Sequence, residues 1–174
     1  DEKDPRVRAK NTDVDFPLND EYKDIIPEML KHLRYSQIEK LSKKYDLRPG
    51  MGLAAPQLGI NKNFFVVCYE VKDGVFDDYI LINPKVISYS EEMIYAGEGE
   101  GCLSVNREVE GIVPRHARIT VEAYDLDGNK RKYRVREDLA IAFQHELDHL
   151  NGILFVDYID PKDPYKNADL YREI

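Results

Sequence analysis

The sequence predicts an α+β fold in which mostly antiparallel β-sheets pack around one buried central helix. The middle of the chain holds several segments rich in β-branched and aromatic residues, and no helices alternate with them as they would in a parallel α/β sheet. Residues 138–150 have helical periodicity but are apolar on most sides, which is typical of a helix enclosed by other elements. This helix carries the pattern His-Glu-x-x-His at residues 145–149.

Length and composition predict one globular domain, residues 1–174. A chain of 174 residues can bury a core without disulfides, and its 43% hydrophobic and 33% charged content is typical of globular proteins. The apolar runs are too short to span a membrane. The first ten residues are charged and polar, so we expect no secretory signal, and because Met is not the first residue we expect a trimmed start.

The net charge of −8, from 25 basic and 33 acidic residues, argues against direct nucleic-acid binding, which favours a basic surface. Two cysteines are too few for a secreted disulfide framework. Cys68 lies in an apolar run, and we interpret it as a buried small hydrophobe. These features predict a cytoplasmic protein, although a processed organellar enzyme would have the same properties, and we expect a monomer.

Two helices are expected before the first glycine-rich stretch. Residues 19–35 place their apolar side chains on one side at helical spacing, and Pro27 must start or kink that helix. Ser36 and Glu39 form a capping-box pattern that predicts a second, short helix ending at Lys44. Residues 50–59 then end the helical part of the chain.

The expected strands lie between the two helical regions. They are residues 64–70, 79–87 and 118–124. The pair Asp127-Gly128 predicts a tight hairpin into a further strand at 130–135. The helix at 138–150 follows, with Gly152 as its stop signal. We expect a last short strand at 153–158 and then a polar tail.

The pattern His-Glu-x-x-His predicts a metal site. On a helix, His145 and His149 are at i and i+4, so their imidazoles share one face and can bind one ion. Glu146 is placed to take the proton of a water that the metal activates. The alternative is a pair of ordinary helical histidines. Because the helix is otherwise apolar, burying two histidines and a glutamate without a partner would be costly, which favours the metal site.

A catalytic metal needs a third protein ligand. One metalloprotease pattern places a third histidine six residues after the second, but Phe155 occupies that position. Another protease class uses a downstream glutamate, and Glu173 lies at a suitable distance, although in a polar tail without helical periodicity. Cys102, within Glu-Gly-Cys-Leu-Ser, can supply a thiolate, or it can be a buried core thiol. Of these candidates, Cys102 is favoured.

Residues 50–57, Gly-Met-Gly-Leu-Ala-Ala-Pro-Gln, form another constellation. They lack the Lys-Ser/Thr pair of a phosphate-binding loop. The simplest interpretation is a turn followed by a small-residue packing segment. Gln57 is also a neutral side-chain donor, which suits the stabilisation of an oxyanion.

Taken together and in this order, residues 50–57, 100–104 and 144–149 resemble the three motifs of the peptide deformylases. Val-Pro-Arg at 113–115 and Asn-Gly at 151–152 are also similar to that family, so the resemblance covers nearly the whole chain. The additional segment 36–48 resembles the longer-insert subclass typical of Gram-positive bacteria.

The resemblance implies a metal-dependent hydrolase that removes the N-formyl group from the initiator formyl-methionine of nascent polypeptides and releases formate. It implies the following roles: Cys102, His145 and His149 as metal ligands, Glu146 as general acid/base, Gln57 and the backbone N–H of Leu103 as oxyanion donors, and Gly52 as a substrate contact. The implied cofactor is one divalent ion, physiologically Fe²⁺, which Ni²⁺, Co²⁺ or Zn²⁺ can replace. The implied partners are N-formylmethionyl nascent peptides, with the ribosome exit region as a further candidate.

Two other interpretations remain open on the sequence. In an endopeptidase, Glu173 or another residue would be the third ligand and Cys102 would be inert. In a non-catalytic metal-binding protein, the same ligands would hold an ion without turnover.

Overall fold

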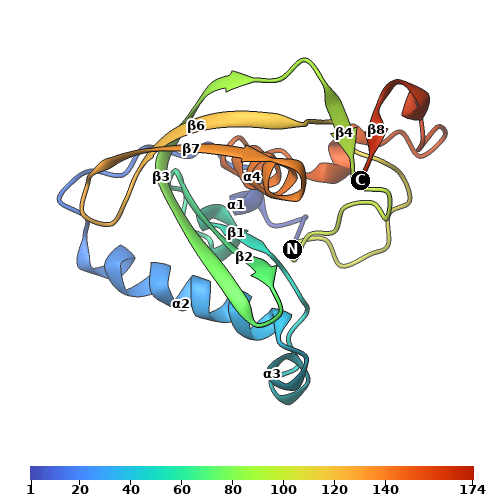
Figure 1. The fold of residues 1–174 in the computed structure, drawn as a ribbon. Coiled ribbons are helices and arrows are strands. Elements are labelled where there is room, and N and C mark those ends of the chain that lie inside the picture. The colour runs from blue at the N-terminus through green and yellow to red at the C-terminus, as the bar shows by residue number, and fades with distance from the viewer.

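A computed structural model describes residues 1–174, with four α-helices and two β-sheets (Figure 1). The larger sheet has the strand order β1-β2-β3-β6-β7, and every neighbouring pair in it is antiparallel. Its strands are β1 (Gly52–Ala54), β2 (Phe64–Lys72), β3 (Val75–Tyr89), β6 (Arg118–Tyr124) and β7 (Lys130–Arg136). The predicted α+β class with mostly antiparallel sheets is therefore confirmed.

The smaller sheet has the order β5-β4-β8. Its strands are β4 (Met93–Tyr95), β5 (Arg115–His116) and β8 (Arg172–Glu173). β4 pairs with β5 antiparallel and with β8 parallel, so the expected polar tail ends as a strand. None of the helices is long and apolar enough to cross a bilayer.

The helices are α1 (Pro5–Arg8), α2 (Asp20–Gln37), α3 (Glu39–Lys44) and α4 (Glu137–Leu150). Asn19 caps α2 by accepting a hydrogen bond from the backbone N–H of Tyr22, and Pro27 lies inside the helix and does not start it. Gly152, just beyond α4, has a φ of 71°, the left-handed conformation expected of a residue that ends a helix.

The two long helices pack on opposite faces of the larger sheet, as the alternation of side chains along β2 shows. Phe64 and Val66 belong to the apolar cluster that includes Leu33 of α2. Phe65 belongs to the cluster that includes Phe143 of α4. Because successive side chains of a strand point to opposite faces, β2 is covered on both sides. This explains why its sequence reads as a continuous apolar run.

The predicted capping box at Ser36 is wrong. Ser36 lies in the last turn of α2, and Ile38 precedes α3 without a side-chain cap. The Ser36 hydroxyl instead donates to the carbonyl of Leu33 and accepts from the backbone N–H of Gly50 at 3.1 Å. It therefore ties α2 to the glycine-rich segment.

The predicted strand at 153–158 is also wrong, because residues Phe155–Tyr158 form a 3₁₀-helix. The Asp157 side chain accepts from the backbone N–H of Leu154 at 3.0 Å, and the Asp157 N–H donates to the Leu154 carbonyl. These local bonds close a turn that the apolar composition of the segment does not indicate. Two further 3₁₀-helices span Ala55–Leu58 and Ala168–Leu170.

β7 is an outer strand of the larger sheet and is strongly basic. Its basic residues are Lys130, Arg131, Lys132, Arg134 and Arg136, all of them exposed. Lys130 pairs with Glu122 and Arg131 with Asp125, whereas the other three have no ion-pair partner.

Candidate active site

The first part of the site comes from α4, which presents His145, Glu146 and His149 toward one region. Glu146 and His149 are buried, with exposed fractions of 3% and 1%. The imidazole rings of His145 and His149 are edge to face, with their centroids 5.0 Å apart. The spacing of i and i+4 on one helix produces this geometry.

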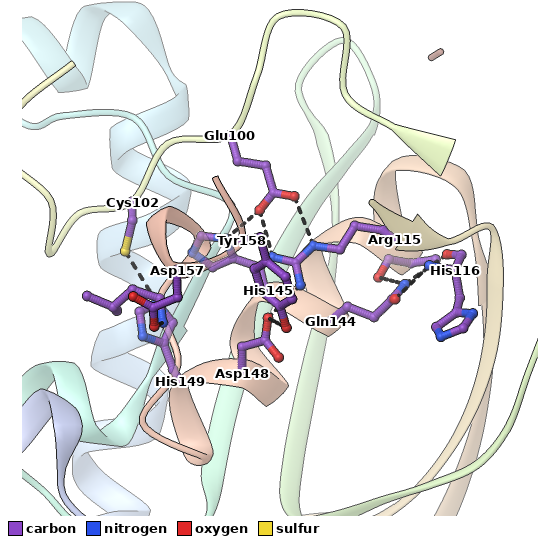
Figure 2. Close-up of polar contacts among 12 residues, drawn as sticks. Glu100, Cys102, Arg115, His116, Gln144, His145, Asp148, His149, Asp157 and Tyr158 are labelled. Carbon is purple, nitrogen blue, oxygen red and sulfur yellow. Dashed lines mark hydrogen bonds and ion pairs between the residues drawn. The ribbon is translucent and has the colours of Figure 1, made fainter. Parts of the chain in front are cut away.

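Gln144 holds α4 in register with the smaller sheet. Its Oε1 accepts from the backbone N–H of His116 at 2.8 Å, and its Nε2 donates to the carbonyl of the same residue at 2.8 Å (Figure 2). A side-chain amide that bonds to both the backbone N–H and the carbonyl of one strand residue pairs with that residue as a neighbouring strand would. The helix that carries the histidines is thereby fixed against β5.

The second part of the site is Cys102, which arrives from the loop between β4 and β5. Its Sγ lies 3.3 Å from Nε2 of His149 (Figure 2). One ligand atom each of Cys102, His145 and His149 lies within 4.8 Å of the others, which makes these residues a group able to bind one ion. The structure therefore brings Cys102 together with the two predicted histidine ligands, from which it is far apart in the sequence.

The other two candidate ligands are elsewhere. The ring of Phe155 stacks on that of His145, with centroids 6.1 Å apart, and is a packing contact. Glu173 lies in β8, and its carboxylate is beside Gly97. Neither residue belongs to the group of possible ligands.

The cluster fits a divalent metal by its chemistry and by its unsatisfied atoms. A thiolate with two imidazoles is a donor set that binds zinc, iron, nickel or cobalt. Nδ1 of His149 and Oε1 of Glu146 are buried without any hydrogen-bond partner, although buried polar atoms are normally paired. Such unpaired atoms indicate that the site is built around something that these side chains bind.

Glu100 orients His145. Its Oε1 accepts a hydrogen bond from Nδ1 of His145 at 2.9 Å, which leaves Nε2 free to bind a metal (Figure 2). Arg115 in turn holds Glu100 through two bonds of 2.9 Å, and it also contacts Asp148 at 2.5 Å. Asp148 accepts a further bond from the Tyr158 hydroxyl at 2.9 Å. A polar chain thus runs from His145 through buried Arg115 to the exposed Tyr158.

The sequence interpretation missed this chain of residues. Glu100, Arg115 and Asp148 all lie in or beside the motifs that were recognised, yet no role was assigned to them. The available signal was the presence of charged residues in the motifs that carry the possible metal ligands, since metal-bound histidines usually donate their second ring nitrogen to a carboxylate. The pairing itself joins segments 15 and 33 residues apart and is not visible in any local pattern.

The environment shifts the pKa of Glu100, Glu146, His145 and His149. Burial alone would raise the pKa of Glu100, but hydrogen bonds from Arg115 and His145 outweigh it and lower the pKa to about 2. Burial raises the pKa of Glu146 to about 7. Burial would lower the pKa of His145, yet its hydrogen bonds with Cys102 and Glu100 raise it to about 10. For His149, burial and the nearby His145 lower the pKa to about 3.

Gly52 is the closest point of β1 to Glu146. A Cβ atom at this position would lie 2.5 Å from Oε2 of Glu146, and also within 2.8 Å of its Cγ and 2.7 Å of its Cδ. Only glycine leaves room for the carboxylate in this position. Contact with Glu146 therefore explains why position 52 is a glycine, independently of the predicted substrate contact.

Gln57 and Leu103 lie on the other side of the cluster. Oε1 of Gln57 accepts from the backbone N–H of Ala54 at 2.9 Å, which fixes the amide so that its Nε2 points toward Ser104 Oγ at 3.0 Å and Cys102 Sγ at 3.7 Å. The backbone N–H of Leu103 donates to no protein acceptor. The Leu103 N–H is therefore free to donate, whereas Nε2 of Gln57 lies near the thiol and already donates to Ser104.

A cavity of about 570 Å³ opens onto these groups. All the predicted site residues except the more deeply buried His149 line it: Gly52, Gln57, Cys102, Leu103, His145 and Glu146. Ile141 and Ala142 of α4, together with Met51, form part of its apolar wall. The cavity can therefore bind an apolar side chain beside the possible metal ligands.

Comparison with known proteins identifies the family. A sequence model described as polypeptide deformylase matches residues 1–165. The chain belongs to the polypeptide deformylase family. A peptide deformylase of Macrococcus caseolyticus is 50% identical over 163 residues, which cover 93% of this chain and 89% of that protein. A peptide deformylase of Oceanobacillus iheyensis is 47% identical over 161 residues, covering 92% and 88%.

Solved structures agree with this assignment. The crystal structure of a probable peptide deformylase from Synechococcus phage S-SSM7 is similar with a TM-score of 0.72 and 35% identity, and the match covers 90% of this chain and 95% of that chain. The resemblance inferred from the three motifs is confirmed. Members of the family are hydrolases, so the chain is an enzyme of that class.

Proposed function

We propose that residues 1–174 act as a single catalytic domain, a metal-dependent hydrolase that removes the N-formyl group from the initiator formyl-methionine of nascent polypeptides. The observation that carries the proposal is the group Cys102, His145 and His149 beside the buried Glu146, at a cavity that all of them except His149 line. The products are formate and a peptide with a free amino terminus. N-formylmethionyl peptides in the cytoplasm are the proposed substrates, and a monomer is the proposed working form.

Cys102, His145 and His149 would hold one divalent ion, for which Fe²⁺ is the proposed physiological choice and Ni²⁺, Co²⁺ or Zn²⁺ are substitutes. When bound, the ion supplies positive charge that polarises the formyl carbonyl and makes water more acidic. Glu100 supports this role because it fixes the ring of His145 with Nε2 free. His149 is buried, and it contacts Cys102 through Nε2 while its Nδ1 has no hydrogen-bond partner.

Glu146 is proposed as the general base and then the general acid. A carboxyl group with a pKa of about 7 exchanges protons readily near neutral pH. Its carboxylate takes a proton from water while the water oxygen bonds to the formyl carbon. The carbon–nitrogen bond then breaks, and Glu146 returns the proton to the leaving nitrogen. No other residue of the cavity is placed beside both Gly52 and the histidines to do this.

The oxyanion that develops on the formyl oxygen would be stabilised by Nε2 of Gln57 and the backbone N–H of Leu103. Gln57 is preorganised by its bond from Ala54, and the Leu103 N–H has no competing protein acceptor. Donors that are fixed before the reaction stabilise a transition state without the cost of reorganising. This proposed role also explains why position 57 holds a neutral hydrogen-bond donor, glutamine.

The cavity also supports the choice of substrate. A formyl group carries only hydrogen on its carbonyl carbon, and the position closest to Glu146 on β1 is a glycine without side-chain volume. The apolar wall formed by Met51, Ile141 and Ala142 can bind a methionine side chain. β1 is the outer strand of the larger sheet, so the peptide can extend along its free edge as an added strand.

The proposal is tested with Cys102→Ala and metal analysis of protein purified without oxygen. Wild-type protein should contain close to one equivalent of metal and release formate from formyl-Met-Ala-Ser. C102A should lose both the metal and the activity. If C102A keeps both, Cys102 is not a ligand and the proposed mechanism is wrong. If wild-type protein cleaves internal peptide bonds and releases no formate, the chain acts as an endopeptidase.

A further inference from the structure

Arg48, between α3 and the glycine-rich segment, makes contacts that the proposed mechanism does not use. Its Nη2 donates to the backbone carbonyl of Cys102 at 2.7 Å. Its Nη1 reaches the carbonyl of Val105 at 3.4 Å and Oδ1 of Asn106 at 3.2 Å. The backbone N–H of Val105 also donates to the Cys102 carbonyl, at 3.0 Å. The guanidinium therefore clamps the turn that carries the thiol, and one carbonyl accepts two hydrogen bonds.

The Cys102 carbonyl and the Leu103 N–H belong to the same peptide group. Because this group is planar, fixing the direction of the carbonyl also fixes the direction of the N–H on its other side. Because its electrons are delocalised, a cation at the oxygen draws charge from the nitrogen and makes the N–H a stronger donor. The Leu103 N–H has no protein acceptor, and Leu103 lines the cavity.

We infer that Arg48 is a positioning residue that aligns and polarises the Cys102–Leu103 peptide group for its role as an oxyanion donor. The inference rests on the proposed function, because the oxyanion is part of that mechanism. Arg48 acts from behind the peptide, on the oxygen, while the substrate approaches the nitrogen side. The effect should therefore appear in the chemical step and not in the binding of the ground state.

Arg48 also lines the cavity, so a direct contact with the substrate is the competing explanation. The two explanations differ in kinetics. A substrate contact would raise KM, whereas a polarised donor changes kcat with little change in KM. A general loosening of the loop would lower metal content and thermal stability together with activity.

The sequence allows a direct measurement of the peptide group. The chain has two cysteines, Cys68 before Tyr69 and Cys102 before Leu103, so Cys102–Leu103 is the only Cys-Leu bond. Protein labelled with ¹³C-carbonyl cysteine and ¹⁵N-leucine gives a single cross-peak from this bond. In the diamagnetic zinc-loaded protein, Arg48→Met should move both the Cys102 carbonyl and the Leu103 nitrogen upfield, and Arg48→Lys should move them less.

Arg107→Met is the matched control. Arg107 follows the same loop, is exposed, and pairs with Glu2 at 3.1 Å, so the variant removes an equal charge nearby without touching the Cys102 carbonyl. R107M should leave the cross-peak and the activity unchanged. In R48M, kcat should fall about three- to tenfold, less than the roughly hundredfold loss seen when an oxyanion donor is removed outright, because the donor remains. R48K should recover part of kcat.

The inference is overturned if R48M moves the cross-peak but keeps the wild-type kcat, or if KM rises while kcat is unchanged. It is also overturned if the cross-peak stays in place. A wild-type protein that releases no formate would contradict the proposed function instead, while the cross-peak would still report whether Arg48 polarises the peptide group. The two failures are therefore distinguishable.

Discussion

Replacing Arg115 by methionine would remove the cation that holds Glu100 and Asp148 together beside the possible metal ligand His145. Arg115 and Glu100 have side-chain exposures of 3% and 5%, and Asp148 has 17%. Removing one partner of a buried ion pair leaves an unpaired charge in a poorly solvated site and costs about 3–5 kcal/mol. We expect the free energy of unfolding of Arg115→Met to fall by that amount, measured by urea denaturation of the zinc-loaded protein.

The control is Arg34→Met. Arg34 pairs with Asp78 at 2.7 Å, but their side chains are 41% and 36% exposed. An exposed pair contributes less than about 1 kcal/mol, so R34M should remain close to wild type. Adding Glu100→Gln to R115M removes the stranded charge and should restore part of the stability. The reasoning would be refuted if R115M loses no more stability than R34M, or if R115M/E100Q is no more stable than R115M.

Three further predictions concern the same site. The pKa of Glu100 is lowered from 4.5 to about 2 in the folded protein, and this lowering stabilises the fold by roughly 3 kcal/mol above pH 4.5. The stabilisation is lost as the pH falls toward 2. E100Q should lack this part of the acid dependence in denaturation curves measured across that range. Gly52→Ala should displace the Glu146 carboxylate, because its Oε2 would be 2.5 Å from the new Cβ. We expect kcat/KM to fall about 100-fold in formate-release assays. Unchanged activity with metal bound would contradict a role for that carboxylate. Glu146→Gln should keep the metal, measured by elemental analysis, while kcat falls about 10²- to 10⁴-fold; loss of the metal would instead make Glu146 a ligand.

The elements that the sequence predicted well are those with a strong local pattern. α2 and α4 have helical periodicity with a cap or a stop residue at one end, and β6 occupies the predicted residues 118–124. β3 begins earlier than predicted, at Val75, because its first residues, which include Asp77 and Asp78, pair with β2. Helical periodicity and helix caps depend only on neighbouring residues, so elements predicted from them are found in the structure.

The errors arise where a distant partner decides the structure. Ser36 bonds to Gly50 and so does not cap α3, and Arg172–Glu173 becomes a strand only because β4 lies beside it. The same distinction holds in the site. The histidine spacing is local and could be predicted, and Cys102 could be ranked above Phe155 and Glu173. The Glu100–Arg115–Asp148 chain is formed by tertiary contacts alone and could not.

The basic strand β7 has a consequence for how copies of the protein meet. An outer strand exposes backbone N–H and carbonyl groups that can pair with the edge of another molecule, and such pairing leads to aggregation. Two copies of β7 placed edge to edge would bring their basic side chains together, three of them without an ion-pair partner on each strand, in a chain whose net charge is −8. This repulsion acts over a screening length of about 10 Å at 0.1 M salt and about 3 Å at 1 M. The positive charge of β7, opposite in sign to that of the whole chain, therefore disfavours edge-to-edge pairing at this strand, and concentrated salt weakens that effect.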